Sequence, residues 1–82
     1  MKTEVKKIEI ITRTLNNVMT GLKISRDMDL DAAERVNTYD LKEDERKFAA
    51  DAVSAMYNEA MRAAMIVAAN MLMNCAQEQD TI

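Results

Sequence analysis

The chain has 82 residues, 49% of them apolar, and a net charge of −3 from 11 basic and 14 acidic side chains. This length allows one small domain, and the apolar share excludes a disordered tail. The charge balance disfavours a surface that neutralises nucleic-acid phosphates. The chain has no Pro and one Gly, which disfavours the tight turns of a sheet. We therefore predict an all-α fold and a single helical domain over residues 1–82.

Residues 3–24 are predicted to form the first helix, because apolar residues recur there at steps of three and four. These residues are Ile8, Ile11, Leu15, Val18 and Leu22. The β-branched run VKKIEIIT could instead form a strand, but the apolar stripe continues to Leu22 and favours a helix. Gly21 and Ser25 predict that this helix ends or kinks near residues 21–25.

Residues 26–40 are polar and carry signals for a second, short helix. Asp31 is followed three positions later by Glu34, a spacing that resembles a capping box. We therefore predict a short helix at about 32–37, which lies between the two longer ones.

The acidic run of this segment resembles the start of a calcium-binding loop. Such a loop requires Gly at its sixth position and a bidentate Glu at its twelfth. Counted from Asp27, these positions hold Ala32 and Thr38. We therefore interpret the run, which is Asp27, Asp29 and Asp31, as helix caps and a solvated acidic loop.

The third predicted helix is long, from about 41 to 77. Asp40 and Glu43 repeat the cap spacing at its start, and no helix breaker follows until about Gln77. Its main apolar stripe repeats after eleven residues, a period that favours a straight or slightly right-handed pairing of helices. We expect the first helix to pack on this one. The stripe consists of Val53, Met56, Ala60, Ala64, Val67, Met71 and Cys75.

The C-terminal third of the chain is apolar on almost every side of its helix, which indicates burial on more than one face. Ile66 and Met73 form a second apolar strip, framed by polar residues, with Phe48 on the same side. A chain this short cannot cover both strips itself, so we predict an oligomer. The candidate interface residues are Phe48, Arg62, Ile66, Asn70, Met73 and Asn74. Asn70 and Asn74 either face water or set the register of a helix pair.

Chemistry-bearing residues are scarce. The chain has no His and a single Cys, so no intramolecular disulfide can form, and a reducing cytoplasm fits this usage. The longest near-apolar run is too short for a membrane span and contains Arg62. We predict no catalytic, cofactor-binding or metal-binding residues, and a cytoplasmic protein that is not an enzyme.

The general run of MKTEVKKIEIITRTLNN and of AMRAAMIVAANMLMN resembles the cytoplasmic accessory lysis-inhibition proteins, or antiholins, of T-even bacteriophages. The resemblance covers most of the chain without a diagnostic motif, so it transfers no functional residues. It implies a protein of the host cytoplasm that binds the cytoplasmic N-terminal part of the phage holin and delays hole formation.

Together, these features predict a non-enzymatic regulator that acts through helix–helix contacts. Its expected partners are itself, as a dimer or higher oligomer, and another protein, which the resemblance identifies as the cytoplasmic segment of a membrane protein. The alternative is a small nucleic-acid-binding or nucleotide-binding regulator of a phage or a bacterium.

Overall fold

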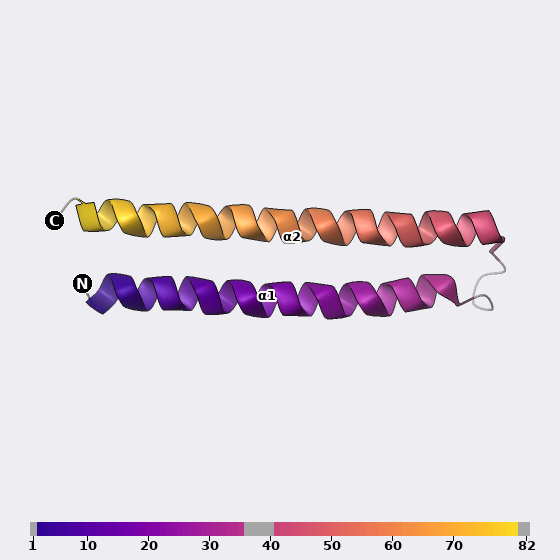
Figure 1. Cartoon of the computed structure of the whole chain (residues 1–82), viewed down its shortest axis with the longest axis horizontal. Coiled ribbons are helices and arrows are strands. Elements are labelled where there is room, and N and C mark those ends of the chain that lie inside the picture. The colour runs from indigo at the N-terminus through magenta and orange to yellow at the C-terminus, as the bar shows by residue number, and fades with distance from the viewer. Residues whose placement is uncertain (1, 36–40, 81–82) are drawn as a thin grey trace.

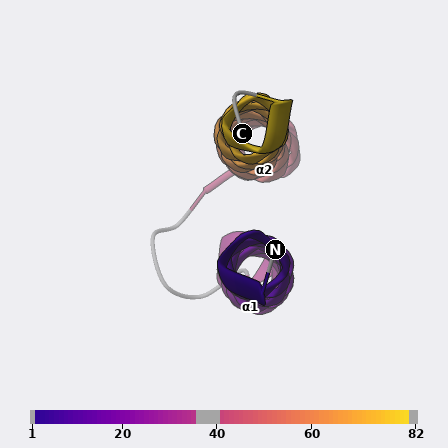
Figure 2. The same ribbon diagram turned by 90° about the vertical axis from the view of Figure 1, so that its left-hand side faces the viewer.

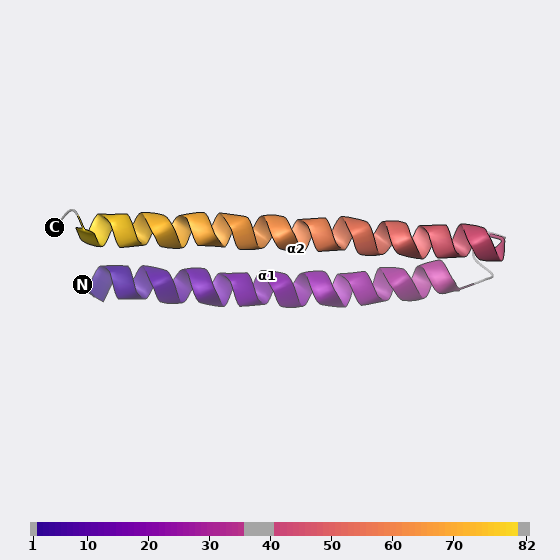
Figure 3. The ribbon, with the colours of Figure 1, turned by 45° about the horizontal axis from the view of Figure 1, so that its top comes forward.

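The computed structural model describes residues 2–35 and 41–80, and the side chains of residues 5–35 and 41–77. Two long helices form an antiparallel hairpin (Figure 1): α1 spans Lys2–Glu34 and α2 spans Glu43–Asp80. Both ends of the chain lie at one end of the rod, and α1 and α2 remain side by side when the rod is turned (Figure 3). The Cα atoms extend over 62 × 15 × 10 Å. The predicted all-α class is confirmed.

Helix α1 ends ten residues later than predicted, because it continues through Gly21 and Ser25 to Glu34. A helix-interior Gly costs about 1 kcal/mol relative to Ala, and tertiary packing on α2 offsets this cost. The separate short helix at 32–37 is wrong, since residues 32–34 are the last turn of α1. Residues 36 and 37 lie outside the described part of the chain.

The end of α1 also explains the spacing that resembled a capping box. Asp31 does not cap a new helix but forms an ion pair with Arg35, one turn further on, at 2.5 Å. The backbone N–H of Arg35 donates to the carbonyls of Asp31 and Ala32, which closes the last turn.

Helix α2 begins at Glu43 and ends at Asp80, close to the predicted 41–77. The side chain of Glu45 reaches back and accepts a hydrogen bond of 3.0 Å from the backbone N–H of Lys42, as the third helical residue of a capping box does. Glu43, Asp44 and Glu45 fill the first turn, where negative charge is stabilised by the helix dipole. The other predicted cap residue, Asp40, lies outside the described residues.

The two helices pack along one stripe each, and both stripes follow the same spacing of four, four and three residues. This spacing repeats every eleven residues, which holds two helices nearly straight along each other (Figure 2). On α1 the buried or half-buried positions are Ile11, Leu15, Met19, Leu22, Arg26, Leu30 and Ala33. On α2 the repeating stripe is Arg46, Ala50, Val53, Tyr57, Met61, Ala64, Ala68, Leu72 and Cys75.

The eleven-residue period predicted for α2 is therefore found, but the predicted rotation of the helix is partly wrong. Val53, Ala64 and Cys75 belong to the stripe that faces α1. The other four predicted positions, Met56, Ala60, Val67 and Met71, are exposed. A helix that is apolar on several sides contains two stripes of the same period, and periodicity does not choose between them.

The core between the helices is thin. Among the described residues, the buried apolar side chains are Ile11, Met61, Ala68 and Cys75, and no large side chain is fully buried. Two helices share only one line of contact, so each leaves most of its circumference to solvent. A core of this size leaves the separate hairpin poorly stabilised.

Candidate interaction surfaces

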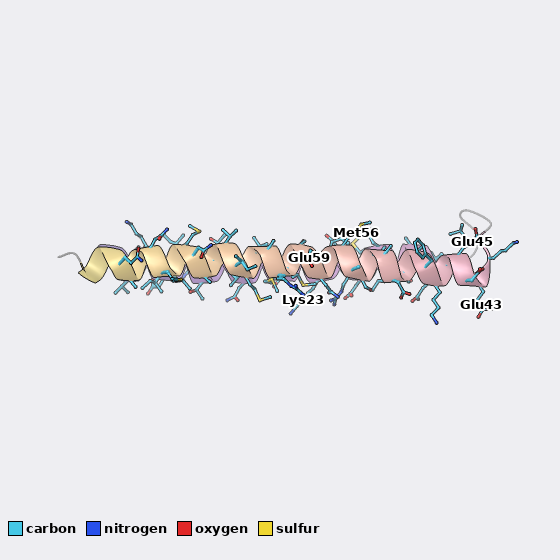
Figure 4. All side chains as sticks on the ribbon, turned by 90° about the horizontal axis from the view of Figure 1, so that it is seen from above. Lys23, Glu43, Glu45, Met56 and Glu59 are labelled. Carbon is cyan, nitrogen blue, oxygen red and sulfur yellow. The ribbon has the colours of Figure 1, made fainter. Side chains whose placement is uncertain are left out.

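The first candidate surface lies on the side of α2 that is turned away from α1, and we call it the outer strip. It consists of Phe48, Ile66 and Met73, which are 76%, 54% and 60% exposed. Phe48 lies eleven residues before Glu59 and so shares its side of the helix, which points outward in Figure 4. Large apolar side chains with this much exposure are absent from the contact with α1 and remain available to another molecule.

The polar residues predicted beside this strip are divided between two surfaces. Arg62 and Asn70 are exposed and lie at helical positions that border the outer strip. Arg62 has no ion pair with any described residue. Asn74 is also exposed, but it lines a groove between the two helices instead. The structure therefore brings five of the six predicted interface residues to one side of α2.

The second candidate surface is a flank of the hairpin where both helices are seen side by side, and we call it the neutral flank. Along its middle runs an open groove lined by Thr14, Leu15, Val18, Ala63, Ala64 and Val67. Nearer the chain termini the same flank continues as a second groove, lined by Lys7, Ile10, Ile11, Met71, Asn74 and Cys75. The first groove is lined almost wholly by apolar atoms, whereas the lining of the second includes the charged side chain of Lys7.

The neutral flank extends beyond the grooves because the eleven-residue spacing repeats its positions. Met56 lies eleven residues before Val67, and Figure 4 shows it pointing to one flank of the rod, whereas Lys23 points to the other. Gly21 and Ser25 of α1 occupy the same side as Ile10 and Thr14. From Ile10 to Ser25 on α1, and from Ala52 to Asn74 on α2, no charged residue falls at a neutral-flank position.

The opposite flank differs in chemistry. Its helical positions hold Glu9, Lys23 and Asp27 on α1, and on α2 they hold Asp51 and Arg62, at the border between this flank and the outer strip. Charged side chains of both signs along this flank keep it solvated. Val5 and Met65 also lie on this flank and are 53% and 49% exposed. The neutral flank is therefore distinguished by its lack of charged residues from Ile10 to Ser25 and from Ala52 to Asn74.

A polar contact joins the helices near the loop end. The phenol of Tyr57 on α2 donates a hydrogen bond of 2.5 Å to the Asp29 carboxylate on α1. This hydrogen bond raises the pKa of Tyr57, burial and the charge of Asp29 act in the same direction, and Ser25 opposes them. The phenol is thus held in its protonated form, where it serves as a donor that fixes the two helices against each other.

The acidic run of α1 does not form a cation site. Asp27, Asp29 and Asp31 lie inside the helix, so their assignment to caps and a loop is wrong. Steps of two residues rotate a helical side chain by about 200°, which turns neighbouring carboxylates apart. Within residues 5–35 and 41–77, no group of three or more His, Cys, Asp or Glu side chains could hold a metal ion.

Over the same described residues, neither α1 nor α2 contains a stretch that is both long enough and apolar enough to cross a bilayer.

Comparison with protein-family models, curated proteins and solved structures finds no match to this chain. The resemblance to phage lysis-inhibition proteins is neither supported nor refuted by these comparisons, and it remains a prediction.

The neutral flank was not recognised as a separate surface from the sequence. Four of its residues, Met56, Ala60, Val67 and Met71, were assigned to the contact with the first helix. The available signal was the spacing of charge: no Asp, Glu, Lys or Arg occurs at these helical positions over more than six turns of α2.

Proposed function

We propose that this chain is a non-enzymatic protein-binding regulator that acts through helix–helix contacts, both with a second copy of itself and with another protein. The observation that supports this proposal is the exposure of large apolar side chains on two sides of the hairpin, the outer strip and the neutral flank. One surface suits self-association, and the other remains for the regulated protein.

The outer strip has the composition of a binding surface. Covering a half-exposed Ile66 or Met73 contributes about 1 kcal/mol each, and an aromatic side chain such as Phe48 contributes more when it enters a pocket. Met side chains adapt their shape to different partners. The favoured partner is an amphipathic helix, which would lie along α2 with its apolar face on this strip.

A narrower form of the proposal is lysis inhibition, in which the partner is the cytoplasmic N-terminal segment of a phage holin. Its support is the resemblance of residues 1–17 and 60–74 to T-even antiholins. Inhibition of this kind requires no chemistry. It requires that the regulator bind one state of the holin more tightly than another, since only differential affinity shifts an equilibrium.

Co-expression with the soluble cytoplasmic segment of a T-even holin, followed by purification through a tag on this chain, tests the proposal. We expect co-elution with the wild type and loss of the complex with Ile66→Glu or Met73→Glu. The matched control is Asn17→Glu, which adds the same charge to an exposed position of α1. Absence of a complex, together with unchanged lysis timing on deletion of the chain, would refute the antiholin role.

A further inference from the structure

We propose that the neutral flank binds the neutral flank of a second copy, with the two loops at opposite ends, so that two hairpins form a four-helix bundle. This inference deepens the self-association part of the proposed function by assigning it a surface and an orientation. In this arrangement α1 lies antiparallel to α1 of the second copy, and α2 antiparallel to its α2. A two-fold axis then passes between the hairpins near their midpoints, about residues 18 and 61.

The exposed area indicates that a second copy is needed. The chain exposes 6602 Å², whereas a compact monomer of its 9.3 kDa exposes about 5,000 Å². The neutral flank runs over about 22 residues of α2, which is about 33 Å of helix, and the hairpin is 15 Å wide. Two such flanks bury about 1,000 Å² when both copies are counted, which reaches the lower limit for a specific complex. Two copies in contact therefore supply the core that one hairpin lacks.

The distribution of charge selects the orientation. The half of the hairpin near the loop, residues 23–62, holds seven basic and ten acidic residues, a net charge of −3. The half with the chain termini, residues 1–22 and 63–82, holds four of each and is neutral. Loops at the same end would place two charges of −3 beside each other. Loops at opposite ends place each acidic half against a neutral one, which avoids this repulsion.

The small side chains of the flank permit the contact. Gly21, Ala52, Ala60 and Ala63 lie at its positions. Apart from the neighbouring backbone of α1 itself, no atom of the described residues lies within 4 Å of where a Cβ at Gly21 would stand. A helix-interior Gly has no packing role inside the separate hairpin. Across a flank-to-flank interface, Gly and Ala residues allow two helices to approach closely.

Two neighbouring residues provide a matched test of the surface. Val67 lies on the neutral flank and Ile66 on the outer strip; both are β-branched, and they are 57% and 54% exposed. Light scattering and sedimentation of the full chain should give a dimer for the wild type and for Ile66→Glu. Val67→Glu should weaken the dimer at least about 100-fold, because two-fold symmetry places one unpaired Glu from each copy in the buried interface. Circular dichroism at matched concentration reports whether each variant remains helical.

The orientation is tested with a spin label attached to Lys47→Cys in a chain that also carries Cys75→Ala. This double variant is used once light scattering shows that it has the same oligomer mass as the wild type. Lys47 lies about 14 residues from the midpoint of α2, so at 1.5 Å per residue the two labels should be more than 40 Å apart along the bundle. Loops at the same end would bring them within about 30 Å, and such a distance would overturn the orientation.

The outcomes separate this inference from the proposed function. A wild-type monomer would overturn both self-association and the flank assignment. A dimer that resists Val67→Glu but dissociates with Ile66→Glu would preserve self-association and overturn the flank as its surface. Loss of holin binding with Ile66→Glu, without loss of the dimer, bears only on the partner-binding part of the proposal.

Discussion

Met61 provides the sharpest test of how α2 is rotated against α1. It is 7% exposed, whereas Met28 of α1 is 68% exposed and lies outside the stripe of α1 that faces α2. Replacing either by Ala removes the same atoms from a helix interior, so the change in helix propensity is nearly equal for the two variants. The difference between them therefore measures burial.

We expect Met61→Ala to lower the free energy of unfolding by about 2–3 kcal/mol. Replacing a buried Met by Ala lowers the free energy of unfolding by about 2–5 kcal/mol. The low end applies here because the core is a single layer, and solvent and neighbouring side chains can fill the space that Met61 leaves. For a domain of this size the midpoint of thermal unfolding should fall by about 10–20 °C. Met28→Ala should change the free energy by less than about 0.5 kcal/mol.

Urea unfolding followed by circular dichroism measures both values. The variants and the wild type must be compared at one protein concentration, because dimerisation makes apparent stability depend on it. A cost below about 1 kcal/mol for Met61→Ala, or an equal cost for Met28→Ala, would refute the rotation of α2 that the structure shows.

Three further predictions concern the hydrogen bond between the helices, the start of α2 and the outer strip. Tyr57→Phe should destabilise the hairpin slightly and remove a loss of stability at high pH. Because the pKa of Tyr57 is raised in the folded state, its contribution to stability is complete below about pH 10 and disappears as the pH rises through the folded pKa. Urea unfolding of both proteins at a series of pH values measures this difference. Glu45→Ala should cost about 0.5–1 kcal/mol by removing the bond to the Lys42 N–H; no change in the urea midpoint would mean that this cap is not formed in solution. Ile66→Glu should leave helical content unchanged, since its side chain lies outside the hairpin core, and an unfolded circular dichroism spectrum would contradict this placement.

The helical class and the start of α2 could be predicted because the signals are local. The absence of Pro, the steps of three and four, and the acidic turn before Phe48 all act within a few residues. The length of α1 could not be predicted in this way, because Gly21 and Ser25 are local signals for an end that tertiary packing overrides. The eleven-residue spacing from Ile11 to Leu22 and Ala33 extends past both and would have indicated the longer helix.

The division of α2 into surfaces was harder to predict for a physical reason. Its C-terminal half is apolar on nearly all sides, so hydrophobicity carries no information about which side faces α1. The observed stripe also includes Arg46 and Tyr57, which are half-buried through their long apolar parts and which a polarity pattern assigns to solvent. The outer position of Ile66 and Met73 could be predicted from the sequence, because the polar residues Glu59, Arg62 and Asn70 surround them on the helix.

The mass of the chain in solution tests the central claim, that this protein works by contact between helices of separate chains. Light scattering after gel filtration, at tens of micromolar, should give at least twice the monomer mass of 9.3 kDa. A stable, folded species of 9.3 kDa at that concentration would contradict the claim, because the hairpin would then tolerate its exposed apolar surfaces without a second copy.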